Sequence, residues 1–356
     1  AEIGICVVII AVVLDKLSLA WANKQKDYFA NLSFFQRNRL SIFFIFLTII
    51  CSIVAVISSY YFPKGFNYLY LIPFNKGLTV SPILDAFVDW IWNTFFYYLN
   101  AFNIFLLTNV LGPMKQAYLN MPVVSTFVLF MGAGYIIGGI RSCLIVGSLI
   151  LFIALSEYWD RTLITLYMAT FAVGVSAISG IVVGSLCAQN EFASKSILSL
   201  CDFFQTFPSF IYLIPVILLF GITDTSVMIA AIVYASVPAT RYTVEGLRSV
   251  PPSLHDAGSM SGVSKMQRWR LIDLPLALPH IMLGINQTVI FALMMIVLGA
   301  LIGTEDLGQL IMGSLSRPNG AGIGFTLGIF ISFICLAVDN LIRTWADERK
   351  KLLGIN

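Results

Sequence analysis

Charged residues are scarce in this sequence. Asp, Glu, Lys and Arg make up 11% of its 356 residues, whereas they make up about 25% of a typical soluble domain. Hydrophobic residues make up 58%, which predicts an all-α polytopic membrane protein, because a helix satisfies its own backbone hydrogen bonds inside lipid. The formal net charge of +3 is too small to indicate a nucleic-acid partner.

Residues that build metal and catalytic centres are also scarce. The six cysteines stand singly, without CxxC or CxxH spacing, so we expect small buried hydrophobic residues and not disulfides or metal ligands. The two separated histidines, His255 and His280, do not form the acid and histidine cluster that a membrane-embedded enzyme needs. The glycine-rich runs at 132–139 and 299–303 suit close helix packing, and no Walker motif is present.

The chain starts without the features of a secretory leader. Its first residue is Ala1, and no basic segment precedes the first apolar run, so nothing supports a cleavable signal peptide. We expect instead that the sequence is truncated at this end.

Nine apolar stretches are long enough to be membrane spans. They lie near residues 3–20, 41–61, 123–139, 142–158, 162–187, 197–221, 225–242, 276–303 and 323–343. A further segment, 83–118, is rich in aromatic residues but is interrupted by aspartates and asparagines. We expect this segment to be an amphipathic helix at the membrane interface and not a span.

Basic residues gather in three places that these spans put on one side of the membrane. Since cytoplasmic loops are enriched in Lys and Arg, we expect residues 21–40, the polar segment after residue 242 and the C-terminus to face the cytoplasm. Residues 62–120 and the 304–322 connection are then outside. The three clusters are Lys24, Lys26, Arg37 and Arg39; Arg241, Arg248, Lys265, Arg268 and Arg270; and Arg343, Arg349, Lys350 and Lys351.

Two span ends resemble each other. The run VLDKLSLAWANKQK, residues 13–26, matches AVDNLIRTWADERK, residues 337–350, with Asp15 aligned to Asp339 and Trp21 to Trp345. One interpretation is that both ends use the Trp and Lys anchors common at the cytoplasmic face. The other is that residues 1–26 are the last helix of an upstream copy of the same unit.

The most informative segment runs from His255 to Pro279 and is polar between two apolar stretches. In it Asp256-Ala257-Gly258 is followed after three residues by Gly262 and after nine more by Ile272-Asp273-Leu274-Pro275. The small residues permit a tight turn and close approach, and Pro275 and Pro279 would stiffen the return into the membrane. His255 is expected to precede the loop helix.

This spacing resembles the EAA loop of ABC importer permeases, a short cytoplasmic helix-turn-helix that contacts an ATPase. Asp256 stands where that family usually has Glu. The resemblance implies the type I ABC importer permease fold, with ATPase-coupling residues at Asp256, Ala257, Gly258, Gly262, Ile272, Leu274 and Pro275.

Three further elements narrow the resemblance. They are Gln205, Thr206, Pro208, Tyr212, Pro215 and Gly221; Pro275, Pro279, Gly284, Asn286, Gln287 and Thr288; and Leu307, Gly308 and Gln309. Together they resemble the permease subunit of glycine betaine and proline betaine ABC importers, whose relatives include trimethylamine N-oxide permeases. The resemblance implies a bacterial inner-membrane protein that imports glycine betaine, proline betaine, choline or trimethylamine N-oxide, with a role in osmoprotection.

The same resemblance implies an organisation and a set of partners. Residues 1–26 would end an upstream permease copy, 27–120 would form an N-terminal scaffold, and 121–356 would form the permease core with its coupling loop near 245–275. The partners would be two cytoplasmic ATPase subunits that bind ATP and Mg, an extracytoplasmic substrate-binding protein, a second permease half, fused upstream, and membrane lipid. The chain itself would bind no cofactor and would not be an enzyme.

Polar and aromatic residues inside the expected spans are candidates for a translocation path. Polar groups in lipid are costly, so they either line a path or form hydrogen bonds between helices. Aromatic faces could meet a quaternary amine by cation-π contact, or they could be core or lipid-facing. An ion-driven secondary transporter is the alternative, but none of the nine spans has a clear central carboxylate. The candidates are Gln205, Thr206, Phe207, Tyr212, Asn286, Gln287 and Thr288.

Overall fold

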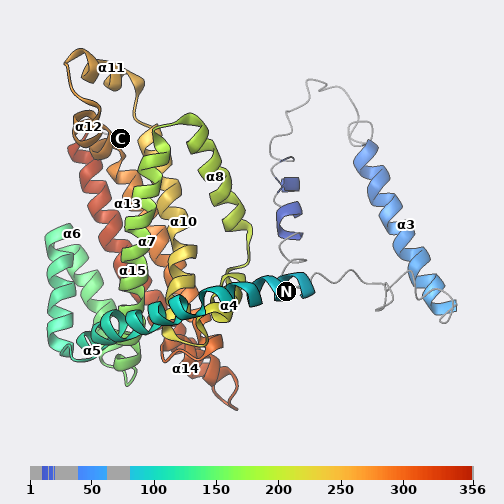
Figure 1. Cartoon of the computed structure of the whole chain (residues 1–356). Helices are drawn as coiled ribbons and strands as arrows, with labels where there is room; N and C mark the ends of the chain where they lie inside the picture. Colours follow the sequence, from blue (N-terminus) through green and yellow to red (C-terminus); the bar gives the residue numbers. More distant parts are fainter. Residues whose placement is uncertain (1–9, 15, 19, 21–38, 62–80, 355–356) are drawn as a thin grey trace. The chain divides into compact units, whose positions relative to one another are not determined.

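The computed structural model describes residues 10–14, 16–18, 20, 39–61 and 81–354, and its only regular elements there are helices. The all-α expectation is therefore confirmed for this part of the chain. The chain divides into two compact units, Ala1–Phe87 and Val88–Asn356 (Figure 1). Most of the first basic cluster and most of the first copy of the sequence repeat lie outside the described residues.

The first unit holds helical residues between 10 and 20, then α3 (Arg39–Tyr61) and the first turns of α4 (Ser81–Phe105). The expected span at 41–61 thus forms one helix. The second unit continues through η3 (Leu106–Leu111), α5 (Gly112–Leu119), α6 (Val123–Ala154), α7 (Trp159–Ala188), α8 (Glu191–Thr206), η4 (Ser209–Tyr212), α9 (Leu213–Phe220), α10 (Asp224–Arg248), α11 (Pro252–Met260), α12 (Lys265–Arg268), η5 (Trp269–Asp273), α13 (Leu274–Gly299), η6 (Ala300–Ile302), α14 (Leu307–Leu315) and α15 (Ala321–Leu352).

Helices α7, α10 and α13 form the centre of the second unit. Small residues let their backbones approach: a Cβ added at Gly180 would lie 2.5 Å from Cβ of Ala239, and one at Gly284 would lie 2.6 Å from Cβ of Tyr242. The largest fully buried side chains of this core include Tyr167 on α7, Met228 on α10 and Leu293 on α13. These three closely packed helices, with α10 in the middle, form a rigid base for the loops and short helices at their ends.

Helix α6 is a hairpin. Its backbone leaves the helical region at Gly138 and Gly139, whose φ is +63°, and a Cβ added at Gly147 would lie 3.1 Å from Cγ of Met131 on the other arm. The expected division into 123–139 and 142–158 is therefore confirmed, although the second arm ends at Ala154. The glycines at 138 and 139 provide the chain reversal. The helix packing expected for this run is also present, since a Cβ added at Gly138 would lie 2.7 Å from Cγ2 of Thr344 on α15 and one at Gly134 would lie 3.0 Å from Cα of Cys143.

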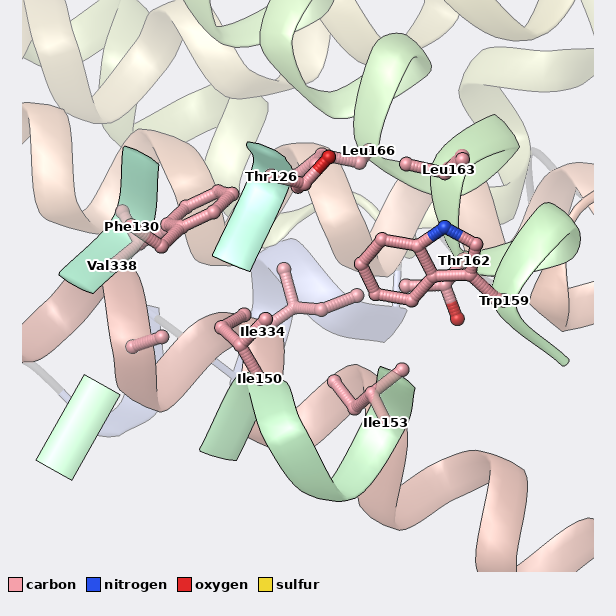
Figure 2. Close-up of a pocket in the computed structure, with 11 residues that line it drawn as sticks. Thr126, Phe130, Ile150, Ile153, Trp159, Thr162, Leu163, Leu166, Ile334 and Val338 are labelled. Carbon is pink, nitrogen blue, oxygen red and sulfur yellow. The ribbon is translucent and has the colours of Figure 1, made fainter. Parts of the chain in front are cut away.

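The hairpin packs against α7 and α15. Figure 2 shows the small gap where these helices meet, lined by Phe130 and Ile150 of α6, Trp159 and Leu163 of α7 and Ile334 of α15. The gap has a volume of about 20 Å³ and an almost wholly apolar lining, so it is a packing defect and not a solute site.

The expected continuous span at 197–221 is wrong. Helix α8 ends at Thr206, and the chain resumes at Ser209 after a bend of 104°. Pro208 causes the break, because the residue before a proline is pushed out of the α region, and Phe207 is accordingly extended, with φ −74° and ψ 133°. Counting this bent pair, the described residues contain up to seven helical spans by length and composition.

Helix α4 differs from the central helices. Figure 1 shows it running across the bundle instead of along it, and Asn103 Nδ2 donates to the carbonyl of Phe220 at 3.2 Å. Length and composition alone would let residues 85–119 cross a membrane. Its crosswise direction supports the expected interfacial position, which stays a prediction.

Contacts along the bundle define its two ends. At one end lie α11, α12 and the C-terminal turns of α15, and at the other lies α14 (Figure 1). Tyr167 near the start of α7 donates to Asp224 at the start of α10, so these starts share the α14 end with Lys115 and Glu305. We call the end that holds α11 and α12 the loop end. Helix α10 runs from the α14 end to the loop end, α13 runs from the loop end to the α14 end, and α15 runs from the α14 end to the loop end.

Candidate functional site

The loop expected to couple to an ATPase is a helix-turn-helix. Helix α11 ends with the Val263 N–H donating to the Gly258 carbonyl at 3.3 Å, and Gly262 has φ +74°. This is the Schellman arrangement, in which a residue with positive φ follows the helix and a later N–H reaches back to satisfy a helix carbonyl. The tight turn at Gly262 predicted from the sequence is confirmed.

The second helix of the loop starts with a capping box. The Gln267 N–H donates to Ser264 Oγ at 3.3 Å, and the Ser264 N–H donates to Gln267 Oε1 at 2.9 Å. The signal S-x-x-Q was present in the sequence, yet it was not used in predicting the loop. Helix α12 then passes through the π-helical η5 directly into α13, so the loop and the span behind it form one continuous helix.

A buried carboxylate joins the two helices of the loop. Asp273 is 8% exposed; its Oδ1 lies 3.0 Å from His255 Nε2 of α11, and its Oδ2 lies 3.5 Å from Arg268 Nε. His255 therefore lies within α11 and does not precede it, which corrects the sequence expectation. Sequence reasoning missed this pair, because no local signal relates His255 to a residue in the following helix.

The seven predicted coupling residues have two different environments. Asp256 and Ala257 are exposed on α11, and Gly262 is exposed at the turn. Gly258 is buried, and a Cβ added there would lie 3.1 Å from Cδ1 of Ile272. Ile272, Leu274 and Pro275 are half-buried along the returning helix. The first group can meet a partner, whereas the approach of Gly258 to Ile272 holds α11 against the returning helix.

The surface of the loop is unusually apolar for an end of the bundle. Met260 is 90% exposed, Met266 is 70% exposed and Leu271 is 68% exposed. Beneath the loop lies a cavity of about 750 Å³, lined partly by Ser185 and Ala188 of α7 and partly by the loop itself. Methionine side chains adapt to irregular surfaces, so these residues suit contact with another protein.

The opposite end holds a separate group of charges. Lys115 Nζ lies 3.1 Å from Glu305 Oε2 and 3.9 Å from Asp224 Oδ2, and Lys115 holds the pKa of Glu305 below its usual range. Asp306 is fully buried, with Oδ1 accepting from the Gln309 N–H at 3.0 Å. Burial raises the pKa of Asp306 to about 7, because its hydrogen bonds, of which the one from the Gln309 N–H has the largest effect, offset only part of the cost of burying charge.

The candidates for a translocation path separate into two groups. Gln205, Thr206, Phe207 and Tyr212 lie together at the break after α8, where Gln205 Oε1 accepts from Arg241 at 3.1 Å and Tyr212 donates to the Phe204 carbonyl. Tyr212 is 8% exposed within an aromatic cluster that continues through Tyr234 to Phe291.

The remaining path candidates lie on α13. Asn286 is 2% exposed and donates to Asp339 of α15 at 2.6 Å, while Thr288 donates to the Gly284 carbonyl at 3.0 Å. Asp339 also accepts from Arg343. Asn286 therefore takes the alternative role, a hydrogen bond between helices, and Gln287 beside it is half-buried.

Known proteins resemble this chain over nearly its whole length. Residues 180–351 match the model of the binding-protein-dependent transport system inner membrane component. A trimethylamine N-oxide transport system permease protein of Pelagibacter ubique is 59% identical over 99% of this chain and 49% of its own length, and one of Ruegeria pomeroyi is 36% identical over 100% and 53%. The chain thus spans about half the length of these two relatives.

A shorter relative is covered almost completely. A glycine betaine transport system permease protein of Bacillus subtilis is 30% identical over 77% of this chain and 96% of its own length. The family match also covers the helix-turn-helix, the flanking α10 and α13, and the broken α8–α9 pair, so similarity and geometry concern the same part of the molecule. The chain belongs to the family of binding-protein-dependent transport system inner membrane components.

Proposed function

We propose that this chain is part of the membrane subunit of an ATP-driven importer for small zwitterionic amines. The observation that carries the proposal is the helix-turn-helix, which presents exposed apolar side chains on a base fixed to α10 and α13. The names of the relatives, which include trimethylamine N-oxide and glycine betaine permeases, support the substrate class. Trimethylamine N-oxide is the first solute to test, because the relatives named for it match nearly the whole chain.

The loop would transmit the conformational change of an ATPase. Asp256 and Ala257, with the exposed Met260, are available to a cleft on that partner, whereas Gly258, Ile272 and Leu274 make the loop move together with α13. Gly262 and Pro275 set the turn and the start of α13. A rigid connection suits this task, since a flexible loop would absorb the motion instead of passing it to the spans.

The partners follow from this arrangement. Two cytoplasmic ATPase subunits would bind ATP and Mg, a substrate-binding protein would dock at the α14 end, and a second permease half would complete the path. This chain would itself bind no cofactor and perform no hydrolysis. Residues 1–26 as the end of an upstream copy, 27–120 as a scaffold and 121–356 as the core remain our proposal for the domain organisation, and the fused second half belongs to it.

Orientation follows from charge. The loop segment carries Lys265, Arg268 and Arg270, and the end of α15 carries Arg349 to Lys351 at the same end of the bundle (Figure 1). Under the positive-inside rule this end, including the C-terminus, faces the cytoplasm of the bacterial inner membrane.

The test uses the full-length transporter, reconstituted with its ATPase and substrate-binding protein in vesicles that have no ion gradient. We expect uptake of radiolabelled trimethylamine N-oxide only when ATP and Mg are on the ATPase side. Uptake that ignores ATP and follows an imposed proton or sodium gradient would contradict the importer and favour a secondary transporter.

A pair of substitutions at the turn tests coupling. Gly262→Val places a β-branched residue at φ +74°, which costs about 1–2 kcal/mol and displaces α11, whereas Gly262→Asn tolerates this conformation. We expect the valine variant to keep ATP hydrolysis but to lose at least about nine-tenths of uptake. The asparagine variant should retain most of it. Equal uptake by both variants would remove the role given to the turn.

A further inference from the structure

A charged network lies on the flank formed by α8 and α10. Arg241 of α10 donates through Nη1 to Asp202 Oδ1 of α8 at 2.6 Å and to Gln205 Oε1 at 3.1 Å, and through Nε to Glu245 Oε1 at 3.0 Å. Arg241 and Asp202 are 39 positions apart in the sequence, so no local pattern shows the network. One guanidinium thus faces two carboxylates and an amide.

This network is exposed in the isolated chain. The Asp202, Glu245 and Arg241 side chains are 55%, 42% and 32% exposed. Arg241 lies seven residues before the end of α10 at Arg248, which is about 10 Å along the helix. Charged side chains at membrane depth are costly unless they face protein or water, so this flank does not face hydrocarbon.

The backbone beside the network is irregular. Helix α8 ends at Thr206, one residue after Gln205, and the bend of 104° follows. Non-helical backbone inside a membrane is tolerated where it is buried in protein or lines a water-filled cavity. The C-terminal carbonyls of α8 add partial negative charge at this place.

Two features of this flank suit a cationic group. The two carboxylates and one guanidinium leave a surplus of one negative charge. Next to Asp202, the ring of Phe203 is 46% exposed and lies 4.5 Å from the ring of Phe207 at the break. A carboxylate beside aromatic faces binds ammonium groups by charge attraction and cation-π contact.

We infer that Asp202, Phe203, Gln205, Arg241 and Glu245 line the water-filled translocation path, where Asp202 and Phe203 receive the ammonium end of the solute. This inference rests on the proposed function. It adds Asp202, Phe203, Arg241 and Glu245 to the path candidates predicted from the sequence. Arg241 holds Asp202 and Glu245 apart and in place, as a positioning residue.

Water access and local charge can be measured without transport. In the assembled transporter in vesicles, Phe203→Cys is treated with a methanethiosulfonate carrying a trimethylammonium group and, separately, with one carrying a sulfonate. Each rate is divided by that of a small thiol in solution, and labelling of the unsubstituted chain is subtracted. We expect both reagents to react, with the cationic one roughly three- to tenfold faster.

Adding Asp202→Asn should bring the two normalised rates together. Val128→Cys on the apolar arm of α6, where the valine is 62% exposed, is the control and should react with neither reagent. No reaction at position 203 would overturn the water-filled path, because lipid or protein then covers this flank. Equal normalised rates in the presence of Asp202 would overturn the preference for a cation.

Uptake gives the second measurement. Asp202→Asn should raise the KM for trimethylamine N-oxide roughly three- to tenfold. Glu191→Gln removes another exposed carboxylate of α8, one paired with Lys195, and should leave KM unchanged. If the unsubstituted transporter takes up nothing, the proposed function fails while the labelling result stands; if it transports and Asp202→Asn has the same KM, only this inference fails.

Discussion

The two ends of the bundle each contain a buried aspartate, and the two aspartates have different partners. At the loop end, Asp273 lies between His255 and Arg268. At the α14 end, Asp306 is fully buried and accepts from the Gln309 N–H. Among the residues that the structure describes, Asp306 Oδ2 and Asp273 Oδ1 each lack a hydrogen-bond partner, so the two aspartates differ in the charged neighbours of Asp273. One end is therefore stabilised by opposite charges and the other by helix capping.

The difference indicates how each end responds to its surroundings. At the loop end, Asp273 lies within ion-pair distance of His255 and Arg268, so the contact between the two helices of the loop should weaken when this carboxylate is replaced. Burial raises the pKa of Asp306 to about 7, so the α14 end should change its protonation near neutral pH. The end proposed to face the binding protein should therefore be sensitive to pH.

The largest effect is expected from breaking the ion pair of the loop. Asp273→Asn leaves His255 and Arg268 without their carboxylate, which we expect to cost about 2 kcal/mol, less than for a fully buried pair because both partners are about one-third exposed. Hydrogen exchange of the α11 amides should then be about 30-fold faster. The measurement is exchange mass spectrometry of the intact chain in detergent.

Arg270→Gln is the matched control, since it removes a charge from the same segment at an exposed position. Its α11 amides should exchange at the original rate. If both variants accelerate exchange equally, the faster exchange results from any change of charge in the loop. The contacts of Asp273 with His255 and Arg268 would then not hold α11 in place.

The contrast also shows what the sequence could predict. The apolar runs gave the central helices, and the glycine spacing gave the turn at Gly262, because both depend on neighbours along the chain. The break at Pro208 was missed because hydropathy continues through it, although the proline itself was visible. The Arg241–Asp202 pair could not be found, because only the packing of α8 on α10 brings these residues together.

The next effect concerns pH at the α14 end. A carboxyl whose pKa is raised on folding favours the folded state when protonated, so it contributes less stability as pH rises from about 4 to about 7 and stays constant above. The amide oxygen of Asp306→Asn can still accept the hydrogen bond from the Gln309 N–H, but the amide does not titrate. The difference in unfolding free energy between variant and unsubstituted chain should change by about 1–3 kcal/mol over this interval.

For Glu305 the stability contribution changes with pH in the opposite direction, and Glu305→Gln removes it. Lys115 lowers the pKa of Glu305, so its contribution is present above about 4 and is lost as pH falls through the lowered pKa. The effect should be smaller, because the side chain is 62% exposed and solvent screens the pair. Thermal unfolding measures both variants, from about pH 2 to 8 so that the range includes the lowered pKa of Glu305. A parallel dependence for Asp306→Asn and the unsubstituted chain would contradict the pH sensitivity of this end.

The smallest effect is expected from adding a methyl group at Gly258, where the two helices of the loop lie close together. The same substitution at Gly308 shows how tightly the α14 end is packed. A Cβ at Gly258 would lie 3.1 Å from the terminal methyl of Ile272, which can move, and alanine gains helix propensity, so Gly258→Ala should change stability by less than about 0.5 kcal/mol. At the α14 end a Cβ at Gly308 would lie 2.7 Å from the Val297 carbonyl oxygen, where backbone must shift, and Gly308→Ala should cost about 1–3 kcal/mol. Chemical unfolding of both variants measures the difference. Equal costs would show that α11 packs against the returning helix as tightly as α14 packs against α13, and the expected difference in packing between the two ends would then be wrong.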